Sequence, residues 1–220
     1  MNRLNVFTYK RIVAGGVLAL ILLARPGPGT AASPTLSADD VVRLHRGEVL
    51  LQTTDREKPG GAARVTALFH TDPGTVWDII GYCKYEYIYV RGLKLCEVLK
   101  PGLFSTRIHH RLRNSWYMPT LDFSFDASRT PSDRGEVHLV EGNLKVLEGW
   151  WMFESLSGTS GILVIHEIRV QPKIPAPRWL VRRTLRKDLP DMLACIRGLA
   201  RASGKKLQLA SDLKRCPGDI

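Results

Sequence analysis

The chain of 220 residues lacks the short motifs that mark many enzymes and metal proteins. It contains no Gly-x-Ser-x-Gly nucleophile elbow and no Cys-x-x-Cys pair. It also has no internal repeat and no low-complexity linker, which excludes a repeat protein and favours a single domain. We therefore expect no catalytic residue, no metal and no cofactor, and function has to be inferred from the fold and from a binding cavity.

Long apolar runs are also scarce. The candidate run, residues 12–24, has 13 residues, whereas a helix needs roughly 20 to span a bilayer. Basic residues precede this run and small residues follow it, which is the layout of a secretory signal. We expect residues 1–32 to be a signal peptide and the rest of the chain to be exported to the periplasm. An uncleaved N-terminal membrane anchor is the alternative.

Acidic residues are outnumbered, and the formal net charge is +11. Residues 1–32 hold four basic and no acidic residues, so the charge without them is +7. A basic excess of this size suits an anionic membrane surface or an acidic partner protein. Export argues against nucleic acid as the partner.

The chain has only four cysteines, Cys83, Cys96, Cys195 and Cys216. An even number in an exported protein favours disulfides, and three pairings are compatible with the sequence. The spacing favours Cys83 with Cys96 and Cys195 with Cys216. Buried free thiols are the alternative, and a zinc site is disfavoured because no Cys-x-x-Cys pair is present.

Turn residues and hydrophobic periodicity divide the rest of the chain into short elements. The expected helices are residues 38–46, 73–80, 83–90 and 177–201. The expected strands are 48–54 continued by 63–69 as one interrupted strand, then 93–100, 104–113, 117–128, 136–140, 144–156 and 162–170. Consecutive strands with short connections predict an antiparallel meander and the α+β class. Pro190 is expected to bend or divide the last helix.

This order of elements resembles the START-like helix-grip fold of the SRPBCC superfamily, which includes polyketide cyclases, coenzyme-Q-binding proteins and lipid-transfer domains. Local features agree: Asp72-Pro73 before Val76-Trp77, Trp151-Met152-Phe153-Glu154 late in the sheet, and Ile174-Pro175 before the last helix. The resemblance implies a curved antiparallel sheet wrapped around a long C-terminal helix. It covers a ligand-binding domain at residues 36–201, which leaves 202–220 as a basic tail.

What the resemblance implies for function is a cavity between sheet and last helix that takes a lipid or another hydrophobic molecule. The residues expected to line it are Phe123, Phe125, Trp151, Phe153, Val181, Leu185 and Met192. His110 and His166 share the inward parity of their strands and could offer a hydrogen bond to a ligand. For each of these residues the alternative is an ordinary core position.

Binding or carriage without turnover is the favoured function. One alternative is a cyclase or hydratase that uses His110 or His166 as acid or base, and another is a ligand-free interaction module of the cell envelope. The basic residues Arg182, Arg183, Arg186 and Lys187 of the last helix are candidates for contact with anionic lipid head groups. Their alternative is a solvated face.

Overall fold

The computed structural model describes residues 36–54, 59–113, 119–130, 134–156, 158–174, 176–203 and Cys216. The predicted signal peptide, and the predicted tail apart from residues 202–203 and Cys216, lie outside the described residues. Within the described part, residues from Leu36 onward belong to one compact unit.

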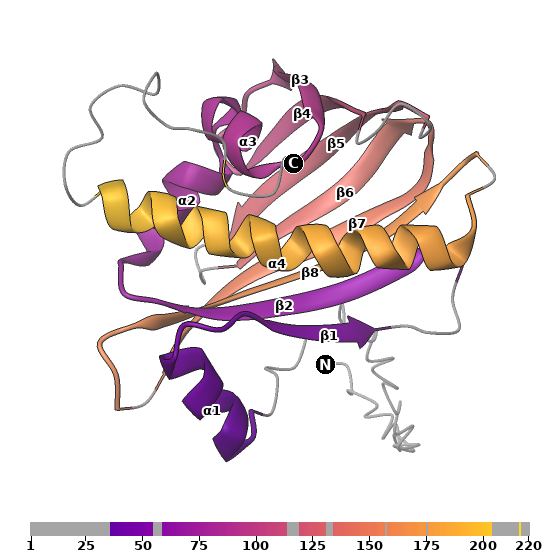
Figure 1. Cartoon of the computed structure of the whole chain (residues 1–220). Coiled ribbons are helices and arrows are strands. Elements are labelled where there is room, and N and C mark those ends of the chain that lie inside the picture. The colour runs from indigo at the N-terminus through magenta and orange to yellow at the C-terminus, as the bar shows by residue number, and fades with distance from the viewer. Residues whose placement is uncertain are drawn as a thin grey trace, which may run out of the picture. The chain divides into compact units, whose positions relative to one another are not determined.

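A single antiparallel sheet of eight strands is crossed on one face by a long helix (Figure 1). The strand order is β1-β2-β8-β7-β6-β5-β4-β3. The strands are β1 Leu50–Thr54, β2 Gly61–Phe69, β3 Leu93–Lys100, β4 Ser105–Leu112, β5 Leu121–Thr130, β6 Arg134–Gly142, β7 Leu144–Ser155 and β8 Ile162–Pro172. The helices are α1 Ala38–His45, α2 Pro73–Ile80, α3 Cys83–Tyr89 and α4 Arg178–Ser203. The predicted α+β helix-grip fold is confirmed.

One prediction about the sheet is wrong. The segments expected to form one interrupted strand are two antiparallel strands, paired from Leu50 opposite Thr66 to Thr54 opposite Ala62. The chain reverses between them, and Gly60 at the end of this turn has a φ of 89°, which favours glycine. The turn residues that we interpreted as an interruption therefore separate two paired strands, and residues 55–58 among them lie outside the described residues.

The two faces of the sheet have separate apolar clusters. On the inner face, toward α4, β2 and β8 contribute Val65, Phe69 and Val164, which pack with Leu193 and Ile196 of α4. We call this cluster the helix-side core. On the outer face a smaller cluster of Leu50, Leu68, Leu163 and Ile165 packs with Leu44 of α1. The period-two alternation of β2 and β8 thus serves two cores.

Helix α4 is a single α-helix through Pro190. Of the two effects predicted for this proline, a bend or a division, the division does not occur. Proline removes one backbone donor, but the turns on both sides of it are anchored, since Leu189 and Leu193 are buried in the helix-side core. The first half of α4 lies very close to β2. A Cβ at Gly61 would be 3.0 Å from Leu185 Cδ1 and 3.1 Å from Val181 Cγ1, so the absent side chain permits this approach.

Candidate functional site

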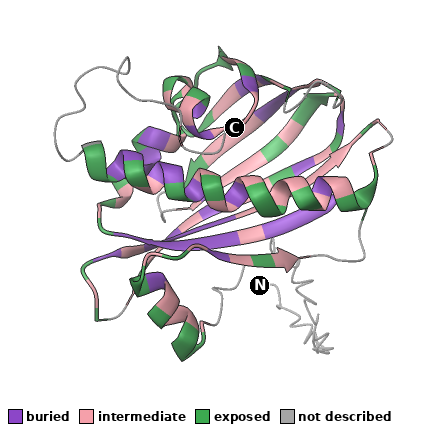
Figure 2. Ribbon diagram, in the orientation of Figure 1, coloured by how far each residue is buried: buried purple, intermediate pink, exposed green. Residues whose placement is uncertain are grey.

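The residues expected to line one cavity fall into two groups on the inner face. Trp151 and Phe153 of β7 belong to the helix-side core, and Leu185 and Met192 of α4 pack against it. Figure 2 shows buried positions along β2 and at intervals along α4. Phe123 and Phe125 of β5 form part of a separate buried cluster farther along the sheet, which we call the second inner cluster. Its members are Ile108, Phe123, Phe125, Leu144 and Leu147. Val181 is buried in the first half of α4, where the helix approaches Gly61 of β2.

His166 lies in the helix-side core and has the environment of a core histidine. Its ring stacks on Trp151 with 3.8 Å between centroids and 16° between planes. Its Nδ1 lies 3.1 Å from the backbone oxygen of Trp150, so in the neutral tautomer Nδ1–H donates to that carbonyl. Burial lowers the pKa of His166 to about 4, against a smaller opposing effect of this hydrogen bond. The ring is therefore neutral at pH 7 and a poor general base.

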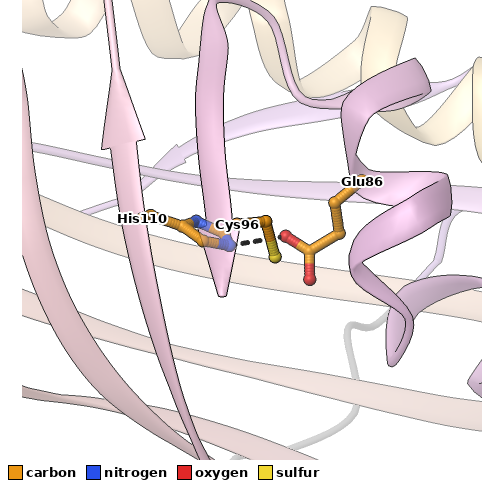
Figure 3. Close-up of side chains that lie close together, drawn as sticks. All are labelled: Glu86, Cys96 and His110. Carbon is orange, nitrogen blue, oxygen red and sulfur yellow. Dashed lines mark ion pairs between the residues drawn. The ribbon is translucent and has the colours of Figure 1, made fainter. Parts of the chain in front are cut away.

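His110 borders the second inner cluster and has a different environment. Its ring lies edge-on to Phe125, with 4.8 Å between centroids, and is 6% exposed. Its Nε2 is 2.8 Å from Oε2 of Glu86, a buried carboxylate on α3. The contact does not have hydrogen-bond geometry, so the buried Nε2 is in an ion-pair contact without a hydrogen-bond partner. Figure 3 shows this pair, with Cys96 beside it.

Helix α3 is attached to the sheet beside this pair. Cys83 at its first turn forms a disulfide with Cys96 of β3, with 5.5 Å between the two Cα atoms. The backbone N–H of Cys96 also donates to the hydroxyl of Tyr87 at 2.9 Å. The second disulfide joins Cys195 of α4 to Cys216. The structure thus has the pairing that the spacing favours, and α3 is clamped next to His110 and Glu86.

Trp77 of α2 is a second buried polar group on the inner face. Its ring contacts Phe153, with 4.6 Å between centroids, and lies over Gly135, where a Cβ would be 2.7 Å from the ring. The indole Nε1 is buried without a hydrogen-bond partner. Neither Trp77 nor Glu86 was predicted from the sequence as a site residue. Helical spacing from Cys83 to Glu86 was the available signal for the carboxylate.

Basic side chains gather on the exposed side of the first half of α4. They line an open groove of about 810 Å³ together with Trp179, which is 63% exposed. The groove residues are Arg178, Trp179, Arg182, Arg183, Arg186 and Lys187. Within the described ranges, no carboxylate forms an ion pair with Arg178, Arg183, Arg186 or Lys187.

The arginines of β4 differ from those of α4. Arg107 pairs with Asp126 at 2.8 Å and Arg111 with Asp122 at 2.7 Å. The hydrogen bonds from His109 and then from Arg111 hold the pKa of Asp122 below its ordinary value. The positive charge of β4 is therefore locally compensated. No helix in the described part of the chain has the length and apolar character needed to cross a membrane.

Comparison with known proteins agrees with this geometry. Residues 70–197 match the family described as "Polyketide cyclase / dehydrase and lipid transport", so the chain belongs to that family. The predicted resemblance is thereby confirmed at the level of the superfamily. No curated protein matches the sequence.

Solved structures show the same fold. The STAR-related lipid transfer protein from Xanthomonas axonopodis (fragment 25–204) aligns with a TM-score of 0.60 and 14% identity, over 70% of this chain and 93% of that one. Human StAR-related lipid transfer protein 5 gives 0.59 and 11% identity, over 71% and 84%. A START superfamily protein from Mycobacterium smegmatis gives 0.53 and 14%, over 64% and 98%. At these identities the likeness establishes the fold.

Proposed function

We propose that this protein binds and carries a lipid or another hydrophobic molecule on the inner face of its sheet, without chemical turnover. The observation that carries the proposal is the second inner cluster. Helix α4 packs mainly on β2, with further contacts to α2, α3 and β1, whereas Phe123 and Phe125 lie on β5. The apolar inner face thus continues beyond the strands that α4 mainly contacts. An apolar wall with a few polar groups is typical of small-molecule sites.

The polar groups indicate the kind of ligand. Buried donors without partners are costly, by about 1–3 kcal/mol each. Trp77 Nε1 is one such position on the inner face, and His110 Nε2 is a second buried nitrogen that contacts the Glu86 carboxylate at 2.8 Å without hydrogen-bond geometry. A ligand whose apolar body covers Phe123 and Phe125 would bring an oxygen-bearing head group next to His110, whose ring contacts both phenylalanines. We therefore favour a fatty acid, a lipid or a similar amphiphile over a purely hydrocarbon ligand.

Organic extraction of the purified protein followed by mass spectrometry tests the proposal directly. We expect an amphiphilic molecule to copurify, and we expect a fluorescent fatty acid to bind the delipidated protein. Phe125→Ala should weaken that binding by about tenfold or more, since it removes a buried aromatic side chain from the wall. Met152→Ala, on the outer face, is the matched control and should bind like the wild type. Equal binding by both variants would refute this location.

An enzymatic role is the second candidate, and the contact between His110 and Glu86 is the observation that favours it. A carboxylate beside an imidazole orients the ring and supports acid–base catalysis. A polyketide-like substrate that turns over with the wild type but not with His110→Gln or Glu86→Gln would assign this role. His166 is not a candidate here, since its ring is neutral and its Nδ1 donates to a backbone oxygen.

We further propose that the carrier loads at an anionic membrane surface through α4. The groove combines an exposed tryptophan with basic residues, and this combination suits the interface between lipid head groups and water. Each basic residue near such a surface contributes about 1 kcal/mol. The double variant Arg183→Gln/Arg186→Gln should lose binding to vesicles with anionic lipid. Arg107→Gln/Arg111→Gln, in which both arginines have acidic partners, is the control and should bind normally.

Export to the periplasm belongs to the same proposal. Two disulfides support it, because disulfides persist in oxidising compartments. Fractionation of cells that express the full chain, with mass spectrometry of the mature N-terminus, would locate the protein and show whether cleavage follows Ala31 or Ala32. A cytoplasmic protein with an intact N-terminus would contradict the proposal.

A further inference from the structure

Helix α3 and strands β3 and β4 bring four side chains with metal-binding atoms to one place. Cys83 and Glu86 are three residues apart on α3, so they share one side of the helix. Cys96 of β3 and His110 of β4 are direct partners across the two strands. Figure 3 shows Glu86, Cys96 and His110 converging from their three elements.

The donor atoms are close enough to share one ion. The ligand atoms of Glu86, Cys96 and His110 all lie within 4.8 Å of one another, and the sulfur of Cys83 is bonded to that of Cys96. Around a tetrahedral zinc ion, neighbouring ligand atoms are about 3.3–3.8 Å apart. Side-chain shifts of about 1 Å would therefore bring these three donors to these separations, and the sulfur of Cys83, once released from its bond to Cys96, would move in as the fourth ligand.

An independent observation also indicates a ligand at this point. His110 is 6% exposed, and its Nε2 has no hydrogen-bond partner although it faces Glu86 and the sulfur of Cys96. Buried polar atoms usually have such a partner, and one that lacks it requires an explanation. A metal ion bound through Nε2 would supply the missing interaction.

We propose that the reduced form of this cluster binds one Zn²⁺ ion, and that the disulfide and the ion are alternative occupants of the same site. In the first step a dithiol reductant donates two electrons and two protons. The Cys83–Cys96 bond breaks, both sulfurs become thiols, and the reductant becomes a disulfide. Zinc then binds both sulfurs as thiolates, the two protons leave to solvent, and Glu86 and His110 complete the tetrahedron.

The donor set suits zinc better than other common ions. Two thiolates, an imidazole and a carboxylate match the ligands that zinc accepts, whereas calcium and magnesium require oxygen ligands. Four protein ligands leave no open position, so the site would be structural. Cys83 and Cys96 are half-buried, which leaves the sulfurs accessible to a reductant. Helix α3 would then be attached to the sheet in both the oxidised and the zinc-bound form, and released only in the reduced, metal-free form.

Cobalt titration tests the site without any assay of ligand binding. The test uses a Cys195→Ser/Cys216→Ser background, which removes the other two sulfurs, and a phosphine reductant, which adds no thiol. We expect thiolate-to-cobalt charge-transfer absorption that saturates at one Co²⁺ per chain and is abolished by an equimolar amount of Zn²⁺. The same protein without reductant should give no such absorption. His110→Ala should weaken zinc binding by more than about tenfold.

A matched comparison measures the coupling to folding. Under reduction the background protein and its Cys83→Ser/Cys96→Ser derivative both lack the disulfide, so they differ only in the two sulfur ligands. Zinc should raise the thermal midpoint of the first and leave that of the second unchanged. The proposal is overturned if no cobalt absorption develops, if the derivative responds like the background protein, or if His110→Ala binds zinc with unchanged affinity.

Discussion

The two histidines on the inner face lie in opposite kinds of environment. Around His166 the ring is stacked on Trp151, its N–H is used by a backbone carbonyl, and α4 completes the packing. Around His110 a buried nitrogen lacks a hydrogen-bond partner, a buried carboxylate touches it, and a disulfide holds the neighbouring helix. The half of the face around His166, which we call the packed half, thus holds its histidine by stacking and a hydrogen bond, whereas the half around His110 keeps a buried ring nitrogen without a hydrogen-bond partner. We therefore expect the functional site near His110, and not along the whole set of predicted lining residues.

The largest effect is expected from a substitution at the centre of the packed half around His166. Leu193 of α4 is fully buried in the helix-side core. Leu193→Ala should lower the free energy of unfolding by about 2–5 kcal/mol, since it removes buried methyl groups and leaves a cavity. Denaturant titration measures the change. Ala194→Ser, at an exposed position of the same helix, should change it by less than about 0.5 kcal/mol. A loss below that limit for Leu193→Ala would show that α4 is not essential to this core.

The free energy of unfolding measured over a pH series tests His166, the buried histidine of the packed half. Its pKa is about 4 in the fold and 6.5 as the ordinary value. As pH falls, His166 binds a proton in the unfolded state before it does so in the fold. The stability that comes from neutral, buried His166 is therefore fully present above pH 6.5 and is lost as pH falls toward 4. The loss amounts to about 3 kcal/mol by pH 4. His166→Asn should show a correspondingly smaller decline between pH 7 and pH 4, whereas the exposed His138→Asn should decline like the wild type.

The clamp on α3 tests the other half. Cys83 and Cys96 are 13 residues apart, and closing a loop of this length is expected to stabilise the fold by about 3 kcal/mol on the chain-entropy model. Cys83→Ser/Cys96→Ser, compared with the wild type in oxidising buffer with a chelator, should lose up to this amount. Hydrogen exchange should rise in α3 and leave β2 and β8 protected. Increased exchange throughout the sheet would contradict the independence of the two halves.

The smallest effect is expected on the outer face of the same strands. Arg111 and Asp122 form an ion pair between side chains that are 50% and 40% exposed. Exposed pairs contribute about 0.2–1 kcal/mol and are screened by salt. Arg111→Gln should therefore reduce the free energy of unfolding within that range at low salt and by less at high salt. A larger effect would mean that the half around His110 depends on its outer face.

Local signals predicted the elements well. Asp72 caps α2 by accepting from the backbone N–H of Thr75, with Pro73 at the first helical position, as its sequence indicated. The predicted strands agree with the observed ones, except for the division into β1 and β2. Contacts between residues that are far apart in the sequence were harder to predict. Parity placed Trp151 and Phe125 on one face, but only the register of the sheet and the position of α4 separate them into two clusters.

The convergence of Glu86 with His110 illustrates the same limit. Glu86 lies on α3 and His110 on β4. The Cys83–Cys96 disulfide holds α3 on β3, and the pairing of Cys96 with His110 across β3 and β4 completes the approach. A spacing rule for metal sites depends on ligands that are close in the chain, so it cannot detect a set that is completed across a sheet. Trp77 was missed for a related reason, because its unsatisfied N–H depends on what surrounds it in the fold.

The pairing of β2 with β8 has a consequence for how the chain folds. These neighbours meet from Gly61 opposite Val170 to Phe69 opposite Ile162, so the strands at the centre of the helix-side core come from the two ends of the domain. Such contacts have high sequence separation, and their loop-closure entropy makes assembly slow. The strands β3, β4 and β5 are neighbours in the chain and can pair early, whereas β2 has β1 on one edge and no partner on its other edge until β8 pairs with it. Before β8 pairs with it, β2 would therefore expose an apolar strand edge, and this is the stage of folding at which a chaperone would be most useful.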